Sequence, residues 1–160
     1  MRVVPYDPRW PDLAAAACAE LAPLFTRVEH IGSTSVPGLC AKPVIDLMAC
    51  VPVLPVPDPP GFALVQTGMR ERLFFRRDGD PAWHLHVVTE DSWDTRNERI
   101  LRDHLRADPD GAARYAELKR RLAAAGLGGE EYTRAKTALI QELTDLGRVA
   151  RGLPSVPVWE

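Results

Sequence analysis

The pattern of apolar and polar residues divides this chain into a first half typical of a β-sheet and a second half typical of helices. A helix is predicted over residues 7–22, with Asp7 as its N-cap and Pro8 in its first turn. Its core-facing stripe is expected to comprise Trp10, Leu13, Ala17 and Leu21. Strands are then predicted at residues 27–31, 43–51 and 62–66, with a stiff proline-rich connector over residues 52–61.

A hairpin gives the strongest local signal in the first half. The pair Asp78-Gly79 separates two apolar runs, and such a pair between strands favours a tight turn. The arms of the hairpin are predicted at residues 72–77 and 82–89. Side chains alternate along the second arm, so His84 and His86 are expected to share one face of the strand.

Three helices are predicted from residue 90 onward. The first is capped by Asp91 or Ser92, and the second begins after Asp108, with Tyr115, Leu118, Leu122 and Ala125 on one face. The third carries Tyr132, Ala135, Leu139, Leu143 and Leu146. We expect a single α+β domain over residues 1–152, followed by an extended tail, residues 153–160, whose Trp159 docks on the body.

The turn between the first two strands carries the clearest candidate chemistry. Gly32 permits a sharp bend and the close approach of a ligand, and the hydroxyls and free amides that follow can hold a phosphate or cap a helical turn. The residues that supply them are Ser33, Thr34 and Ser35. Asp46 lies in an apolar strand, where a carboxylate is costly unless it is paired or bound to a metal. We expect the bend and Asp46 to face one cleft, with Lys42 neutralising an anion there; the alternative is a purely structural turn and acid.

Two further pairs of residues have a spacing that fits a binding site. His84 and His86 are spaced like paired metal ligands, and they can converge with Asp46 on Mg²⁺ or Mn²⁺ if their strands are neighbours. The alternative is that one histidine faces solvent and the other hydrogen-bonds a helix. Tyr132 and Lys136 share a helix face, so they either contact a base and a phosphate or simply pack, with the lysine extended to solvent.

The stretch HIGSTSVPGLCAKPVID, residues 30–46, resembles the signature of the GrpB family. The likeness continues in HLHVV (84–88), ILRDHLRADP (100–109), RYAELKRRLA (114–123) and YTRAK (132–136), and so spans nearly the whole chain. The GrpB family is similar in fold to the nucleotidyltransferase superfamily. The resemblance therefore implies a nucleotidyltransferase-like mixed sheet packed against helices, with a helical C-terminal half.

The same resemblance implies binding of a nucleotide or another phosphorylated small molecule, and transfer of a nucleotidyl group with a divalent metal. On the superfamily pattern, Gly32 and Ser33 hold the substrate and Asp46 holds the metal, with Ser33 and Asp46 as the catalytic residues. Met48 departs from the pattern, because it stands where a second metal-binding carboxylate is expected. The alternatives are a catalytically degenerate nucleotide- or partner-binding module, and a metal-assisted hydrolase that uses His84 and His86.

The composition of the chain bears on which partners it binds and in which cellular compartment it works. The net charge of −2 argues against bulk nucleic-acid binding, and no apolar run reaches the length of a membrane span. The first residues do not have the pattern of a signal peptide. Three cysteines without a C-x-x-C pair fit free thiols in a reducing compartment, so we expect a cytoplasmic protein.

Several other polar residues are interpreted as structural. Arg102 and Asp103 are expected to form a salt bridge between helices, His30 to pack, and residues 119–121 to form a solvated helix face. A serine-hydrolase interpretation is disfavoured because GSTSVPG does not match the G-x-S-x-G nucleophile elbow.

Overall fold

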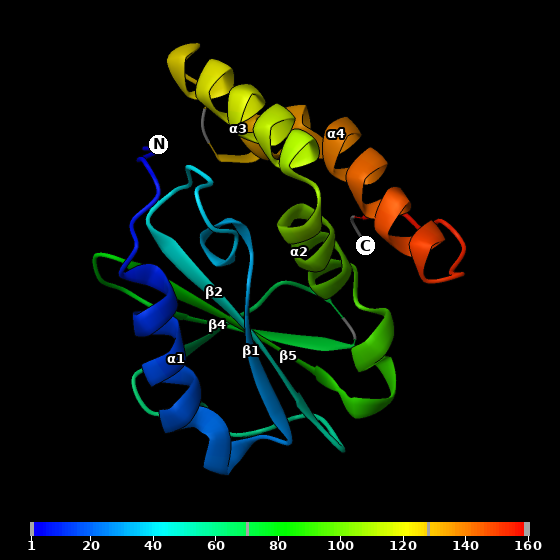
Figure 1. The fold of residues 1–160 in the computed structure, drawn as a ribbon. Coiled ribbons are helices and arrows are strands. Elements are labelled where there is room, and N and C mark those ends of the chain that lie inside the picture. The colour runs from blue at the N-terminus through cyan, green and yellow to red at the C-terminus, as the bar shows by residue number, and fades with distance from the viewer. Residues whose placement is uncertain (1, 70, 128, 159–160) are drawn as a thin grey trace.

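A mixed β-sheet forms the centre of the computed structural model, which describes residues 2–69, 71–127 and 129–158 (Figure 1). Its strands are ordered β1-β2-β5-β4-β3. They are β1 (Arg27–Ile31), β2 (Val44–Val51), β3 (Ala63–Val65), β4 (Arg72–Arg77) and β5 (Ala82–Thr89). The β2 and β5 strands are parallel and the other neighbours are antiparallel, which confirms the predicted hairpin as β4–β5.

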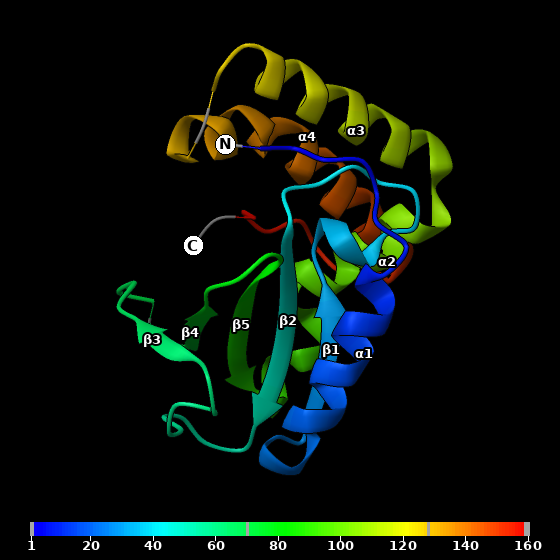
Figure 2. The same cartoon turned by 90° about the vertical axis from the view of Figure 1, so that its left-hand side faces the viewer.

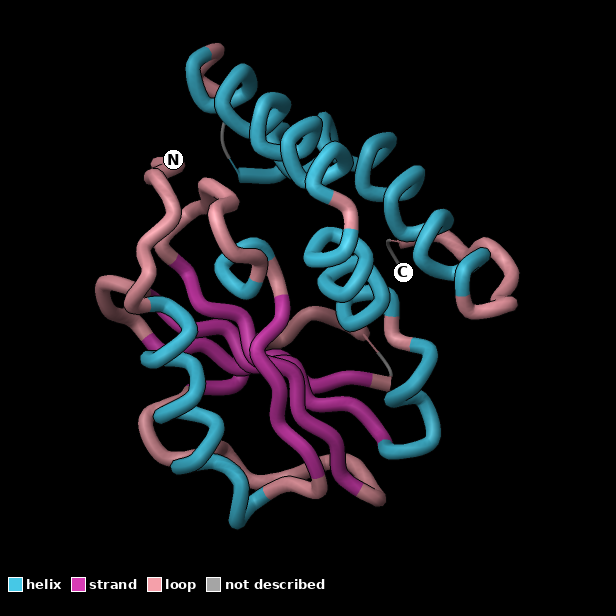
Figure 3. Tube along the Cα trace, in the orientation of Figure 1, coloured by secondary structure: helices cyan, strands magenta, loops and turns pink. Residues whose placement is uncertain are grey.

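The helices lie on both sides of this sheet. Figure 1 shows α1 (Trp10–Leu21) and α2 (Asn97–Ala107) on opposite sides of the twisted strands. Two longer helices, α3 (Pro109–Ala124) and α4 (Gly129–Ala150), form a pair beyond α2, as Figures 2 and 3 also show. The predicted α+β fold with a helical C-terminal half is therefore confirmed.

Side chains alternate along the two central strands, β2 and β5, so that one face of the sheet is apolar and the other carries both polar and apolar residues. The face toward α1 holds the main core, which includes Ile45, Leu47, Ala49, Leu85 and Val87. The opposite face carries Asp46 and His84, which are register partners on the parallel strands β2 and β5. The polar positions of the central strands thus lie on the side of the sheet opposite α1.

The predicted core stripe of the first helix is wrong at one position. The helix begins at Trp10, three residues later than expected, and Asp7 accepts a hydrogen bond from Arg9 N at 2.9 Å. The buried stripe runs through Trp10, Ala14, Ala17 and Leu21. Leu13 is 37 % exposed, because helical geometry places it one residue away from that stripe.

The buried faces of α3 and α4 also differ from those expected. On α3 the buried positions are Gly111, Tyr115, Ala116 and Lys119, whereas Leu118 and Leu122 are half-buried. On α4, Gly147 packs against α2, and a Cβ there would lie 2.8 Å from Ile100 Cγ2. Leu146 beside it is consequently 48 % exposed. The predicted apolar stripes are rotated about the helix axis from the faces that are buried in the structure. The reason is that Ala, Gly and a long polar side chain, and not leucine alone, fill the contacts of these helices with their neighbours.

The chain beyond α4 is extended along that helix. Val158 N donates to Gln141 Oε1 at 3.0 Å, and Gln141 Nε2 donates to Val156 O at 2.9 Å. The predicted docking of Trp159 falls outside the described residues. Among the helices of the described ranges, none combines the length and the hydropathy that crossing a bilayer requires.

Candidate functional site

The bend after β1 and the acid on β2 lie against each other. Gly32 has φ +75°, and a Cβ at this position would lie 2.5 Å from Asp46 Oδ2. The antiparallel register pairs Ile31 with Asp46, so the bend leaves β1 directly beside the carboxylate. Glycine is required here for its backbone conformation and for the close approach.

Ser33 and Asp46 open onto one pocket of about 170 Å³. Its other polar lining residues are Lys42, His84, Lys119, Tyr132 and Lys136. Within the part of the chain that the structure describes, three lysines and one carboxylate therefore meet in a volume that suits a small anionic group. The strands supply Asp46 and His84, and the two long helices supply Tyr132 and two of the lysines.

Lys119 is a pocket residue that the sequence analysis placed on a solvated face. Its side chain is 2 % exposed, and its Nζ donates to Ser33 Oγ at 2.5 Å and to Cys40 O at 3.1 Å. Burial, together with the nearby Lys136, lowers the pKa of Lys119 to about 7. The prediction was wrong at this position and right for its neighbours Arg120 and Arg121, which are exposed. The signal that could have found it was helical phase, because Lys119 is one turn beyond Tyr115.

Tyr132 and Lys136 lie together in the pocket, as their spacing indicated. The Lys136 Nζ is 4.5 Å from the centre of the Tyr132 ring, and the Lys42 Nζ is 4.7 Å from it. Burial lowers the pKa of Lys136 to about 8 and also lowers that of Lys42, while it raises the pKa of Tyr132 to about 12. Tyr132 is fully buried, and its hydroxyl has no hydrogen-bond partner among the described residues. A buried hydroxyl without a protein partner can hydrogen-bond an atom of a ligand.

The two strand histidines have different surroundings. His84 Nδ1 lies 3.4 Å from Asp46 Oδ1, and both side chains are a little more than a quarter exposed, at 29 % and 28 %. His86 Nδ1 instead lies 3.3 Å from Arg72 Nη1, and its ring stacks on Phe74 at 4.9 Å. Burial lowers the pKa of His86, so its imidazole is held neutral beside the guanidinium.

The expected metal trio of Asp46, His84 and His86 is not assembled as a ligand set. The described residues contain no group of three His, Cys, Asp or Glu side chains that could hold a metal ion. Mg²⁺ and Mn²⁺ prefer oxygen ligands, and this pocket offers one carboxylate among ammonium groups. The donor set does not fit a metal held by protein groups alone, and a divalent metal stays a prediction.

Two of the predicted hydroxyls are used within the bend itself. Thr34 Oγ1 lies 2.8 Å from His30 Nε2, and Ser35 Oγ donates to Gly32 O. Both residues are buried and neither lines the pocket, whereas Ser33 does. His30 packs as expected, and burial lowers its pKa to about 4.

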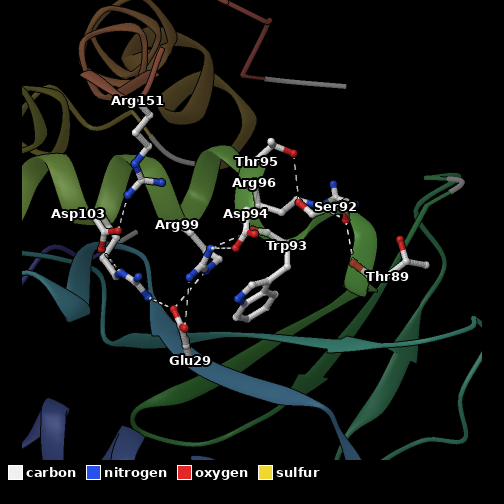
Figure 4. Close-up of polar contacts among 11 residues, drawn as sticks. Glu29, Thr89, Ser92, Trp93, Asp94, Thr95, Arg96, Arg99, Asp103 and Arg151 are labelled. Carbon is white, nitrogen blue, oxygen red and sulfur yellow. Dashed lines mark hydrogen bonds and ion pairs between the residues drawn. The ribbon is translucent and has the colours of Figure 1, made fainter. Parts of the chain in front are cut away.

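A cluster of ion pairs holds the helical half against the sheet (Figure 4). Glu29 on β1 accepts from Arg102 Nη1 at 2.7 Å and from Arg99 Nε at 3.2 Å, both from α2. Arg102 also donates to Asp103 at 2.9 Å, and Asp103 pairs with Arg151 after α4. The expected salt bridge between helices is wrong as stated, because Arg102 and Asp103 lie on the same helix and pair with each other. The network instead reaches β1 through Arg102 and the segment after α4 through Asp103. It fixes α2, and through it the helix pair that carries the lysines.

Replacing Glu29 with glutamine is expected to lower the free energy of unfolding at pH 7 by about 1–2 kcal/mol, because two largely buried arginines lose their shared carboxylate. Burial alone would raise the pKa of Glu29, but hydrogen bonds from Arg99 and Arg102 lower it below 4.5. The stabilisation is therefore present above pH 4.5 and lost as the pH falls through the lower, folded-state pKa. Urea unfolding from pH 7 to pH 3 measures it, with the exposed Glu117→Gln as control.

Comparison with known proteins places this architecture in a family. The model of the GrpB protein family matches residues 1–146. The chain belongs to the GrpB family. A UPF0157 protein of Halalkalibacterium halodurans is 34 % identical over 154 residues, covering 86 % of this chain and 77 % of that protein. A UPF0157 protein of Pseudomonas aeruginosa is 33 % identical, covering 92 % and 67 %.

A solved structure agrees with the fold of this GrpB-family chain. The crystal structure of the conserved protein GrpB from Enterococcus faecalis matches with a TM-score of 0.73 and 27 % identity, covering 91 % of this chain and 96 % of that one. A protein of Mycolicibacterium paratuberculosis named dephospho-CoA kinase is 30 % identical over 158 residues. The match covers 75 % of this chain but 39 % of that longer protein.

Proposed function

We propose that the lysine pocket binds the phosphate groups of a nucleotide or another phosphorylated small molecule. The observation that carries this proposal is that Lys42, Lys119 and Lys136 line one pocket of about 170 Å³ together with Ser33. Burying several ammonium groups together costs free energy through desolvation and mutual repulsion. A bound phosphate offsets both costs, since it supplies negative charge and hydrogen-bond acceptors at the same place.

The depressed pKa values of the lysines support the same proposal. Burial and like charge hold the pKa of Lys119 near 7 and that of Lys136 near 8 in the ligand-free protein. A dianion beside Lys136 favours the charged form of that lysine, so binding should take up protons near pH 8 and above. Proton uptake on binding, measured by calorimetry in buffers of different ionisation enthalpy, is an independent sign that the lysines hold the ligand.

Nucleotidyl transfer is the second step of the proposal. In this step Asp46 and the neighbouring His84 would accept the proton of an attacking hydroxyl, and the lysines would stabilise the charge on the phosphate. Met48 occupies the position of the expected second carboxylate and is fully buried, packed in a cluster with Cys50 and Trp93. A two-metal route therefore lacks a protein ligand there, and a catalytically degenerate binding module is the rival.

The metal-assisted hydrolase has weaker support. It requires both strand histidines, and His86 is engaged with Arg72, which in turn donates to Glu98 at 2.6 Å. The relatives named dephospho-CoA kinase favour a nucleotide over an unrelated phosphate ester as the first ligand to try. They make dephospho-coenzyme A and adenine nucleotides suitable probes.

A thermal-shift and calorimetry screen with pyrophosphate, ATP, CTP and dephospho-coenzyme A tests the proposal. A ligand at one hundred times its Kd stabilises the wild-type protein by about 2.7 kcal/mol. Lys136→Gln and Asp46→Asn are expected to change Kd, the lysine variant raising it by about 10–100-fold through loss of a charged hydrogen bond. Arg120→Gln, on an exposed face of the same helical half, is the control and should bind as wild type. Equal binding by wild type and Lys136→Gln would place the ligand elsewhere.

A measurement of turnover distinguishes a nucleotidyltransferase from a protein that only binds the ligand. Release of radiolabelled pyrophosphate from ATP or CTP, dependent on Mg²⁺ or Mn²⁺ and lost in Asp46→Asn, is the result expected of a nucleotidyltransferase. Saturable binding without turnover is the result expected of a degenerate module.

A further inference from the structure

A hydrogen-bonded chain of three side chains lines one wall of the lysine pocket. Ser33 Oγ accepts a hydrogen bond from Lys119 Nζ at 2.5 Å. The Ser33 hydroxyl is also hydrogen-bonded to the Tyr115 hydroxyl. Tyr115 and Lys119 are one turn apart on α3, and the Lys119 ammonium lies 4.7 Å from the Tyr115 ring centre. Two elements separated by about eighty residues in sequence thus place a hydroxyl, an amine and a phenol in contact.

The chain has a consistent set of donors and acceptors when the amine is neutral. Cys40 O accepts one Lys119 hydrogen, which leaves the nitrogen lone pair free to face Ser33. Burial raises the pKa of Tyr115, so the phenol keeps its proton and can donate it to Ser33 Oγ, while the phenol oxygen accepts a hydrogen bond from Lys136 Nζ at 3.5 Å. With its lone pair occupied by that donor, the serine hydroxyl can direct its own hydrogen to Lys119.

We propose that Ser33 is a nucleophile with Lys119 as its general base and Tyr115 as a positioning residue, acting on a phosphate ester or anhydride. This inference rests on the proposed function, since the anionic oxygens of the substrate would lie against Lys42 and Lys136. Serine–lysine pairs are an established chemical solution to activating a hydroxyl, and they are recognised by geometry rather than by a sequence elbow. The absence of G-x-S-x-G therefore does not exclude it.

The chemistry balances with water as the second reactant. Ser33 Oγ attacks phosphorus, its proton passes to Lys119 Nζ, and the bond from phosphorus to the leaving oxygen breaks, giving a phosphoserine. A water molecule, or an acceptor hydroxyl beside Asp46 and His84, then attacks the phosphoserine. The Ser33 oxygen leaves and recovers its proton from Lys119, while the attacking oxygen gives its proton to the Asp46–His84 pair. The leaving group, released in the first step as an anion with the electron pair of the broken bond, takes up this proton through solvent, which returns the pair to its starting state.

The burial of Lys119 and its protonation state both favour a catalytic role for the Ser33–Lys119 pair over a purely structural contact. Lys119 is 2 % exposed yet lines the pocket, and burial lowers its pKa to about 7, which favours the neutral amine more than in a solvated lysine. A general base is most effective when its pKa lies near the working pH. Desolvation of the amine and the adjacent ammonium of Lys136 keep its pKa there.

Labelling with a small alkyl fluorophosphonate tests the inference directly, because an activated serine displaces fluoride and keeps the phosphonyl group. Intact-mass measurement and peptide mapping are expected to show one adduct, on Ser33, forming faster as the pH rises through 7. Ser33→Ala should remove the adduct, and Lys119→Met should slow it at least 100-fold. Tyr115→Phe should slow labelling about 10-fold with the pH midpoint unchanged. Ser155→Ala, remote on the chain after α4, is the control.

The outcomes distinguish this inference from the proposed function. Wild-type protein that binds pyrophosphate but stays unlabelled at pH 9 overturns the nucleophile and leaves phosphate binding intact. An adduct on a tyrosine, or equal labelling of wild type and Lys119→Met, also overturns it. A Ser33 adduct in protein that shows no pyrophosphate binding supports the serine–lysine pair and contradicts the proposed ligand. Circular dichroism of each variant, and Lys119→Arg as a second lysine variant, guard against loss of folding.

Discussion

Replacing Lys119 with methionine is expected to stabilise the ligand-free protein at pH 7 by about 2 kcal/mol while abolishing its response to phosphate. Burial lowers the pKa of this lysine from 10.5 to about 7, so folding must either desolvate the charge or release its proton. Methionine fills a similar volume without that cost. The gain is reduced by the loss of the hydrogen bonds to Ser33 and Cys40, which leaves two buried acceptors.

The same lysine predicts an unusual pH dependence. Between pH 7 and pH 10.5 the unfolded chain holds the Lys119 proton and the folded chain does not, so stability should rise with pH over this window. The free energy of unfolding can rise by at most about 1.4 kcal/mol per pH unit for one such group. Lys136, with a pKa of about 8, adds to the rise in the upper part of this pH window.

Urea unfolding at pH 7, 8 and 9 measures both effects. Lys119→Met should be more stable than wild type at pH 7, and its pH slope should be smaller. Arg120→Met removes a neighbouring charge on an exposed face of the same helix and should change neither quantity. A methionine variant less stable than wild type at every pH, with the slope retained, would contradict the burial argument.

Gly32→Ala is expected to lower the free energy of unfolding by about 3 kcal/mol and Tm by about 10 °C. Gly32 has φ +75° and ψ −175°, a conformation essentially confined to glycine that costs another residue about 1–3 kcal/mol, and the new Cβ would lie 2.5 Å from Asp46 Oδ2. Relief of that contact must move Asp46, so the variant should also lose ligand binding. Gly38 is a control for positive φ without a close contact, because it has φ +82° and a Cβ added there would meet nothing within 4 Å.

The comparison of the two glycines isolates the contact from the backbone strain. Gly38→Ala should cost about 1 kcal/mol, which is strain alone. Adding Asp46→Ala to Gly32→Ala should recover at least about 1 kcal/mol, a coupling measurable by a double-mutant cycle from thermal or urea unfolding. Equal costs for the two glycine substitutions, with no coupling to Asp46, would show that the bend and the acid are not in contact in solution.

Local features of the site followed from the sequence because they depend on neighbouring elements. The bend at Gly32 and the acid at Asp46 belong to consecutive antiparallel strands, so a short connection brings them together. Period-two alternation placed His84 and His86 on one face of their own strand. The parallel pairing of β5 with β2, which sets His84 beside Asp46, came from the structure. The family match, too, was anticipated from the motifs around residues 30–46.

Long-range features of the site did not follow from the sequence. The run around Lys119 contains three adjacent cations, and local pattern alone makes such a run a solvated surface. His86 has the spacing of a metal ligand, but Arg72 from β4 and Glu98 from α2 occupy its surroundings. The predicted hairpin already puts the strand of Arg72 beside His86, whereas strand spacing could not reveal the approach of Glu98 from α2.

Residue order and periodicity were therefore enough to indicate the sheet-forming first half, the helical second half and the approach of the bend to Asp46, because the bend joins two consecutive antiparallel strands. The mixed sheet was implied by the family resemblance, since its parallel pair joins strands far apart in the chain. Docking of α3 and α4 over the bend decided which lysines are buried and where their amines point. That docking is set by side-chain packing across about eighty residues, as between Lys119 and Ser33, and by the ion pairs of Glu29 with α2. Such contacts pair residues far apart in the chain, and no local pattern encodes which of the possible faces will meet.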